Sequence, residues 1–178
     1  MTGSMVAKRY ALALFQIAKE QNLLDRMEEE LRVVKEVFTY SSDLKAVLKS
    51  PSLETAQKKK ILTMSFASLN QYVVNTLLLL IDRHREDELV AVADEFIELA
   101  NEERGIAEAE VYTTRPLTED ERKAFSSVFA AKVGKKALRI ENFVDTDLLG
   151  GVRLRIGNRI YDGSLRGKLD HLERKLLG

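Results

Sequence analysis

The most informative stretch of the sequence lies near the C-terminus, runs from Val144 to Leu169 and reads VDTDLLGGVRLRIGNRIYDGSLRGKL. Its middle alternates apolar residues with arginines, a period-2 pattern that predicts a half-buried strand over Val152–Ile156. Gly157-Asn158 follows and predicts a two-residue hairpin turn into a second strand, Arg159–Tyr161. The stretch therefore predicts an antiparallel β-hairpin.

Glycines stand at both ends of this hairpin. Gly150 and Gly151 precede the first strand, where a glycine pair allows positive φ and close approach of two backbones. After the second strand, Asp162-Gly163-Ser164 predicts the entry to a final helix, whose stripe consists of Leu165, Leu169, Leu172 and Leu176. We therefore interpret the signature residues as structural: Gly150, Gly151, Gly157, Asp162 and Gly163.

Upstream of the hairpin lie further strand and helix signals. Residues 107–111 alternate apolar and polar side chains, as a half-buried strand does, and Pro116 breaks the pattern. Thr118 and Glu121 predict a capping box for a helix that runs to about Val133. Another alternating strand is marked by Leu138, Ile140, Asn142 and Val144. Residues 106–178 are thus expected to form a small α+β domain of order β-α-β-β-β-α.

Residues 1–105 show the period of helices throughout. Six segments with apolar stripes follow one another: Met5–Gln21, Leu23–Tyr40, Asp43–Leu48, Glu54–Phe66, Leu69–Asp82 and Asp87–Arg104. Ser68–Gln71 resembles a capping box that opens the fifth helix, and Gly105 is expected to follow the C-terminus of the sixth. Short connections between helices favour a six-helix bundle. The whole chain is therefore expected to be α+β, with its domain boundary at Gly105.

Composition bounds the class of protein. The chain has 178 residues, of which 45% are hydrophobic and 31% charged, which is typical of a folded protein. Its net charge is zero, but residues 1–105 carry an excess of acidic residues and residues 106–178 an excess of basic ones. This asymmetry fits either two differently solvated domains or two halves that meet different partners. There is no cysteine, which excludes disulfides and thiolate chemistry.

Membrane and targeting signals are weak. The longest apolar run, Tyr72–Ile81, is much shorter than the roughly 20 residues that a membrane-spanning helix needs. Met1–Tyr10 lacks the apolar core of a signal peptide. We therefore expect any membrane association to occur through partners.

The residues that could support catalysis are few. His84 and His171 are the only histidines, and neither has metal-ligand spacing. Gly163–Lys168 resembles a phosphate loop but lacks its spacing and its Ser or Thr after the lysine. We expect no catalytic residue, no metal and no cofactor. Two alternatives stay: an enzyme without a motif, and a nucleic-acid adaptor that uses the basic C-terminal half. The basic patch of that half consists of Lys132, Lys135, Lys136 and Arg139, with Arg153, Arg155 and Arg159 downstream. The interleaved aromatics expected for base stacking are missing, since Phe143 and Tyr161 are the only aromatics in residues 134–178.

Two helical segments, Met5–Ala18 and Tyr72–Ile81, are apolar nearly all round. One interpretation is that each is a central helix covered by its neighbours. The other is that they border a groove that accepts an amphipathic helix from another chain. The spacing of apolar residues leaves both interpretations open.

Together, two segments carry a family resemblance. The stretch from Gly150 through Ser164 closely resembles the signature of the delta subunit of bacterial F-type ATP synthases, the counterpart of the mitochondrial oligomycin-sensitivity-conferring protein. Arg9–Phe15, which reads RYALALF, is similar to the N-terminal segment of that family. With the helical-then-α+β layout, the resemblance covers essentially the whole chain.

The resemblance implies a non-catalytic stator connector, present as one copy per complex. Residues 1–105 would bind the N-terminal helix of an alpha subunit between the first and fifth helices, and residues 106–178 the C-terminal ends of the b-subunit stalk. The groove is expected to place Ala7, Tyr10, Ala11 and Leu14 opposite Asn75, Leu78, Leu79 and Asp82. The family also implies a peripheral location on the cytoplasmic side of the bacterial cell membrane, and no binding of nucleic acid.

Overall fold

The computed structural model describes residues 4–165, and the chain divides into two compact units, Met1–Ala100 and Asn101–Gly178. The division falls within the sixth α-helix, on the N-terminal side of Gly105. Both helices and strands are present, so the chain has a mixed α+β fold. Each unit is described in turn.

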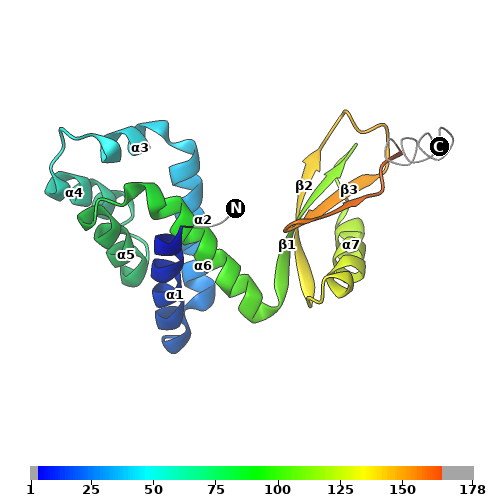
Figure 1. Ribbon diagram of the computed structural model, residues 1–178, viewed down its shortest axis with the longest axis horizontal. Helices are drawn as coiled ribbons and strands as arrows, with labels where there is room; N and C mark the ends of the chain where they lie inside the picture. The colour runs from blue at the N-terminus through cyan, green and yellow to red at the C-terminus, as the bar shows by residue number, and fades with distance from the viewer. Residues whose placement is uncertain (1–3, 166–178) are drawn as a thin grey trace. The chain divides into compact units, whose positions relative to one another are not determined.

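The N-terminal unit is helical (Figure 1). Its elements are α1 (Met5–Glu20), α2 (Leu24–Tyr40), α3 (Ser42–Lys49), α4 (Thr55–Ser65), α5 (Gln71–Asp82), the 3-10 turn η1 (Glu86–Glu88) and α6 (Leu89–Arg104). Buried side chains from all six α-helices form one hydrophobic cluster. At its centre, Phe15 of α1 meets Phe96 of α6 edge to face, with ring centroids 6.0 Å apart.

The start of α5 differs from the predicted one. The predicted capping box at Ser68 is wrong, because α5 begins at Gln71 and Asn70 is its N-cap. The side-chain oxygen of Asn70 accepts a hydrogen bond from the backbone N–H of Tyr72 at 2.9 Å. The backbone N–H of Asn70 itself donates to the carboxylate of Glu30 in α2. A contact between residues distant in sequence thus adds to the local Asn70 cap, and local spacing could not reveal that contact.

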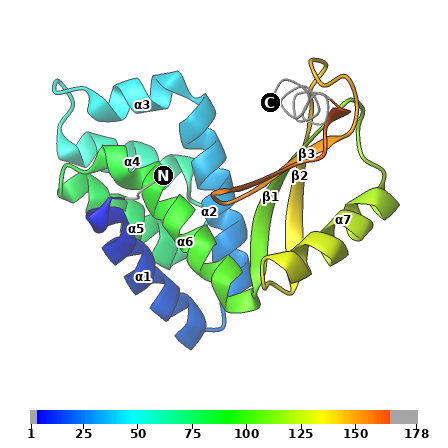
Figure 2. The same cartoon turned by 45° about the vertical axis from the view of Figure 1, so that its right-hand side comes forward.

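The C-terminal unit holds a four-stranded sheet with one helix against it. Its elements are β1 (Ile106–Thr113), α7 (Glu119–Lys132), β2 (Ala137–Val144), β3 (Val152–Ile156) and β4 (Arg159–Asp162). The strand order is β2-β1-β3-β4, with β1 and β2 parallel and the other pairs antiparallel. A parallel pair needs a crossover, and α7 supplies it. Figures 1 and 2 both show α7 along one face of the sheet.

Several local predictions for this unit are confirmed. Thr118 and Glu121 form the predicted capping box at the start of α7. The hairpin pairs Ile156 with Arg159 across the Gly157-Asn158 turn, as predicted. The predicted final helix lies almost entirely outside the described residues.

Candidate binding surfaces

The face of α1 chosen from the sequence points into the protein. Ala7 and Ala11 are completely buried, and Leu14 is nearly so. All three belong to the hydrophobic cluster of the N-terminal unit, whereas Tyr10 is only partly buried against it. Because the side chains of Ala7, Ala11 and Leu14 pack inside this cluster, another chain could not reach them without opening the core.

The residues chosen in α5 are more exposed. Leu79 keeps 42% of its surface accessible, Asn75 and Asp82 are exposed, and Leu78 is partly buried. Asp82 forms an ion pair with Lys59 of α4. The helical face of Leu78 and Asp82 is therefore turned toward α4.

Helical spacing and burial together define a second stripe on each of these helices. On α1 it consists of Val6, Tyr10, Ala13 and Ile17, which recur at i, i+4, i+7 and i+11 and are partly or fully exposed. On α5 it consists of Tyr72, Thr76 and Leu79, which recur at i, i+4 and i+7. The two helices pack against each other. We call these seven residues the α1–α5 surface. Periodicity alone missed it because both stripes of α1 have helical spacing.

The glycine signature joins the start of β3 to the end of β4. The backbone N–H of Gly163 donates to the carbonyl oxygen of Val152 at 2.9 Å, and that of Leu165 donates to the carbonyl oxygen of Gly150 at 3.0 Å. Gly151 has a φ of +86°, and a Cβ there would collide with the backbone of Gly163 and Ser164. The close backbone approach inferred from the glycine pair is thus present.

Two other signature residues act locally. Gly157 has a φ of +55°, which suits the first position of the tight turn. The carboxylate of Asp162 accepts hydrogen bonds from Ser164, including one from its backbone N–H at 2.8 Å, and these bonds lower the pKa of Asp162. Both residues thus shape the turn and the exit of the hairpin.

The sheet face opposite α7 carries a row of planar side chains. The guanidinium of Arg153 lies 4.8 Å from the ring centroid of Tyr112, and that ring stacks on Phe143 with centroids 5.3 Å apart. The hydroxyl of Tyr112 donates to Glu110 at 2.9 Å, which raises the pKa of Tyr112. The row therefore crosses three strands, β3, β1 and β2, and holds its members in fixed orientations.

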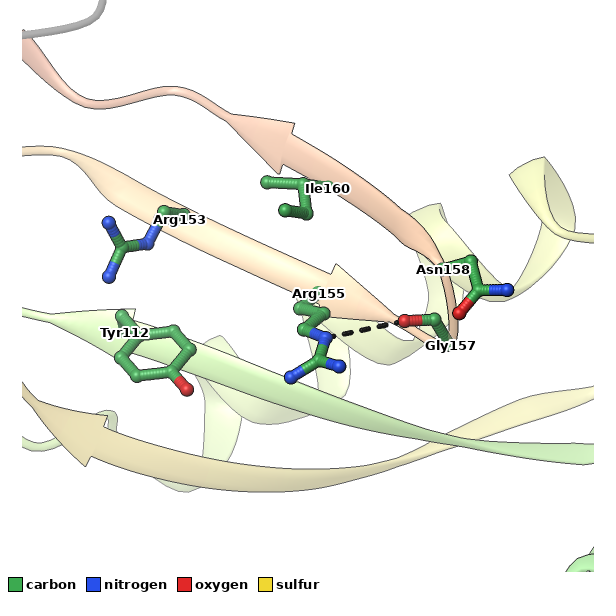
Figure 3. Close-up of a pocket in the computed structure, with 6 residues that line it drawn as sticks. All are labelled: Tyr112, Arg153, Arg155, Gly157, Asn158 and Ile160. Atoms are coloured by element: carbon green, nitrogen blue, oxygen red, sulfur yellow. Dashed lines mark hydrogen bonds between the residues drawn. The ribbon is translucent and has the colours of Figure 1, made fainter. Parts of the chain in front are cut away.

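A hollow of about 390 Å³ opens beside this row (Figure 3). It is lined by Tyr112 of β1, Arg153 and Arg155 of β3, Ile160 of β4, and the turn residues Gly157 and Asn158. The guanidinium of Arg155 donates to the carbonyl oxygen of Gly157 at 3.3 Å and forms an ion pair with Glu110 at 3.4 Å. The sequence showed the alternating arginines, but only the strand order brings Tyr112 and Ile160 beside them.

Other candidate chemistry finds little support in residues 4–165. No group of three or more His, Asp or Glu side chains there could hold a metal ion. His84 is exposed, and His171 lies outside the described residues, as does the second half of the loop-like stretch Gly163–Lys168. Over the same residues, no helix combines the length and apolarity needed to cross a bilayer.

The described residues of the helical unit present exposed apolar stripes, and those of the sheet unit present exposed arginine, aromatic and isoleucine side chains, which are typical of surfaces that bind other macromolecules. Comparison with known proteins narrows this class. The family of the ATP synthase delta (OSCP) subunit matches residues 6–176. The chain belongs to this family.

Individual relatives agree with that assignment. The chain is 56% identical to ATP synthase subunit delta of Anoxybacillus flavithermus, over 99% of both chains. It is 53% identical to ATP synthase subunit delta of a Geobacillus species, over the full length of both. A chain in the cryo-EM structure of the Toxoplasma gondii mitochondrial ATP synthase hexamer shares the fold, with a TM-score of 0.75 at 22% identity over 98% of this chain and 99% of that one. The chain is thus a structural subunit of an F-type ATP synthase, and not a catalytic one.

Proposed function

We propose that the chain is the stator connector of its ATP synthase. Residues 1–105 form a six-helix bundle that caps the catalytic head by binding the N-terminal helix of an alpha subunit. Residues 106–178 bind the C-terminal ends of the b-subunit peripheral stalk. One copy per complex then keeps the head from turning with the rotor, so that rotor torque drives ATP synthesis. The complex holds the chain at the cytoplasmic side of the bacterial cell membrane.

Family membership over residues 6–176 is the observation that carries this proposal. The division into two compact units supports it, since each unit has its own hydrophobic cluster and its own surface to offer. A connector that resists torque needs slow dissociation rather than a reactive group. Apolar area buried at the contact contributes about 25 cal/mol per Å² to the binding free energy, and this stabilisation slows dissociation.

For the alpha-subunit helix we propose the α1–α5 surface as the docking site. Of the eight groove residues expected from the sequence, Tyr10 and Leu79 belong to this surface and would contact the alpha-subunit helix directly. Ala7, Ala11 and Leu14 instead support α1 from inside the core, because burial removes them from the surface. Asn75, Leu78 and Asp82 lie at the border toward α4, where Lys59 pairs with Asp82.

The test compares two leucines that are exposed to a similar degree on the two helices. Leu79 of α5 belongs to the α1–α5 surface, and Leu12 of α1 faces away from it with 48% of its surface exposed. We expect Leu79→Glu to weaken binding of an alpha-subunit N-terminal peptide about tenfold or more, because a carboxylate would enter an apolar contact. Leu12→Glu should leave the affinity unchanged. Equal affinities for both variants and the wild type, measured by calorimetric titration, would rule out this docking site.

A further inference from the structure

Among the described residues of the C-terminal unit, 101–165, α7 covers one face of the sheet. Side chains that point toward α7 form the second hydrophobic cluster, which includes Val111, Leu154 and Ile156. Phe129 of α7 meets Tyr161 of β4 in the same layer, with ring centroids 5.3 Å apart. Strand side chains alternate between faces, so the intervening residues of β1, β3 and β4 lie on the opposite face.

Large side chains remain accessible on that opposite face. Ile160 of β4 exposes 65% of its surface, and Phe143 of β2 is also exposed. Arg155 keeps 53% of its side chain accessible. Aromatic side chains and arginine are the types enriched where protein interfaces concentrate their binding energy. The composition and exposure of this face thus resemble a binding surface more than a solvated one.

The charges around the hollow have a definite arrangement. Two of its six lining residues are arginines, and none is acidic. Asp145 and Glu110 lie outside the lining and contact the two guanidinium groups at 3.3 and 3.4 Å, respectively. A guanidinium has five N–H donors, so each arginine can donate further hydrogen bonds to a carboxylate placed in the hollow. The lining therefore complements a ligand that is both apolar and acidic.

We propose that this hollow docks an amphipathic helix of a partner, with an apolar side chain against Tyr112 and Ile160 and carboxylates against Arg153 and Arg155. A helix is one of the elements that bury an exposed sheet face. The spacing also fits, since alternate residues of a strand lie about 6.6 Å apart and residues i and i+4 of a helix rise about 6 Å. The partner helix should thus carry two acidic residues at i and i+4 beside an apolar stripe.

This inference rests on the proposed function, because it assigns the stalk-binding role of residues 106–178 to one face of the sheet. The partner chemistry it requires can be checked in the b subunit of the same complex. Figure 3 shows why Arg155 is the better probe of the two arginines: its side chain reaches over the hollow near the turn. Arg153, in contrast, also stacks on Tyr112 and pairs with Asp145, so its loss would disturb the row itself.

The experiment measures binding of the full-length chain to the soluble part of the b-subunit stalk by biolayer interferometry. Arg155→Glu should weaken binding at least about tenfold, since it places a like charge opposite the partner's carboxylates. Ile160→Asp should do the same by removing the apolar anchor. The control is Arg159→Glu, the same charge reversal at an exposed arginine of β4 that alternates with Ile160 and so lies on the other face. It should bind within about twofold of the wild type.

The outcomes separate the two proposals. If the wild type binds the stalk and Arg155→Glu binds equally well, or loses no more than Arg159→Glu does, the hollow is not the docking site while the connector role stands. If the wild type does not bind the stalk at all, the proposed function fails and this inference with it. Thermal melting of each variant checks folding. Arg155→Glu should melt close to the wild type, because an exposed ion pair contributes little to stability.

Discussion

At the scale of single residues, Gly151 occupies a position that no side chain fits. Its φ of +86° already disfavours other residues, and the backbone of Gly163 and Ser164 fills the space where a Cβ would be. Gly134 has a similar positive φ of +69° but nothing near enough to meet a Cβ. The two positions thus separate the cost of backbone strain from the cost of a collision.

We expect Gly134→Ala to lower the free energy of unfolding of the C-terminal unit by about 1 kcal/mol, from strain alone. Gly151→Ala should cost about 1–3 kcal/mol more, because the added methyl group must displace backbone. Urea unfolding followed by the signals of residues 106–165 measures both. If both variants lost the same free energy of unfolding, the backbones of Gly151 and Gly163 would not be in close contact.

Glu121 makes the stability of the same unit depend on pH. Hydrogen bonds from Arg115 and from the backbone N–H of Thr118 lower the pKa of Glu121 to about 2. The pKa of an unfolded glutamate is about 4.3. The stabilising contribution is therefore fully present above about pH 4.3 and disappears as the pH falls toward 2. Glu121→Gln should flatten this part of the profile of unfolding free energy against pH, and an unchanged slope would contradict the assignment.

At the scale of elements, local signals were predictable and long-range ones were not. The Gly157-Asn158 turn and the Thr118 capping box need only residues within a few positions of each other, and both are present. At the start of α5, Asn70 also donates a backbone hydrogen bond to Glu30, which lies forty positions away. The parallel pairing of β1 with β2 also joins distant segments, so the row of Tyr112, Phe143 and Arg153 could not be inferred before the strand order was known.

Which face of α1 is exposed could not be read from the sequence for a related reason. Both stripes of the helix have helical spacing, and only the packing of neighbouring helices decides which one is buried. Ala7 and Ala11 are small enough for close helix contact, and they take the buried positions. The stripe through Val6 and Ala13 is the more accessible one, and it belongs to the docking site proposed above.

The cap of α5 provides a direct test at this scale. Asn70→Ala should lower the free energy of unfolding of the N-terminal unit by about 1 kcal/mol, because the backbone N–H of Tyr72 loses its acceptor. Ser68 is exposed and lies outside the helix, so Ser68→Ala should change stability by less than about 0.5 kcal/mol. Chemical denaturation compares the two variants. A larger loss at Ser68 would restore the capping box predicted from the sequence.

At the scale of the whole molecule, the two units have separate hydrophobic clusters and different accessible surfaces. The helical unit offers an apolar surface on α1 and α5, and the sheet unit offers arginines, aromatic rings and Ile160. The excess of acidic residues in residues 1–105 and of basic ones in residues 106–178 is consistent with different partners for the two halves. The proposed connection between the catalytic head and the peripheral stalk requires only two binding surfaces and no reactive group.

The central claim is that one copy of this chain binds the catalytic head. Native mass spectrometry tests it most directly, after the chain is mixed with heads from which the delta subunit has been stripped. We predict a single added mass of one chain per head at micromolar concentrations, with a smaller fraction of that species for Leu79→Glu and an unchanged fraction for Leu12→Glu. Heads that retain their bare mass in the presence of excess wild-type chain would contradict the account.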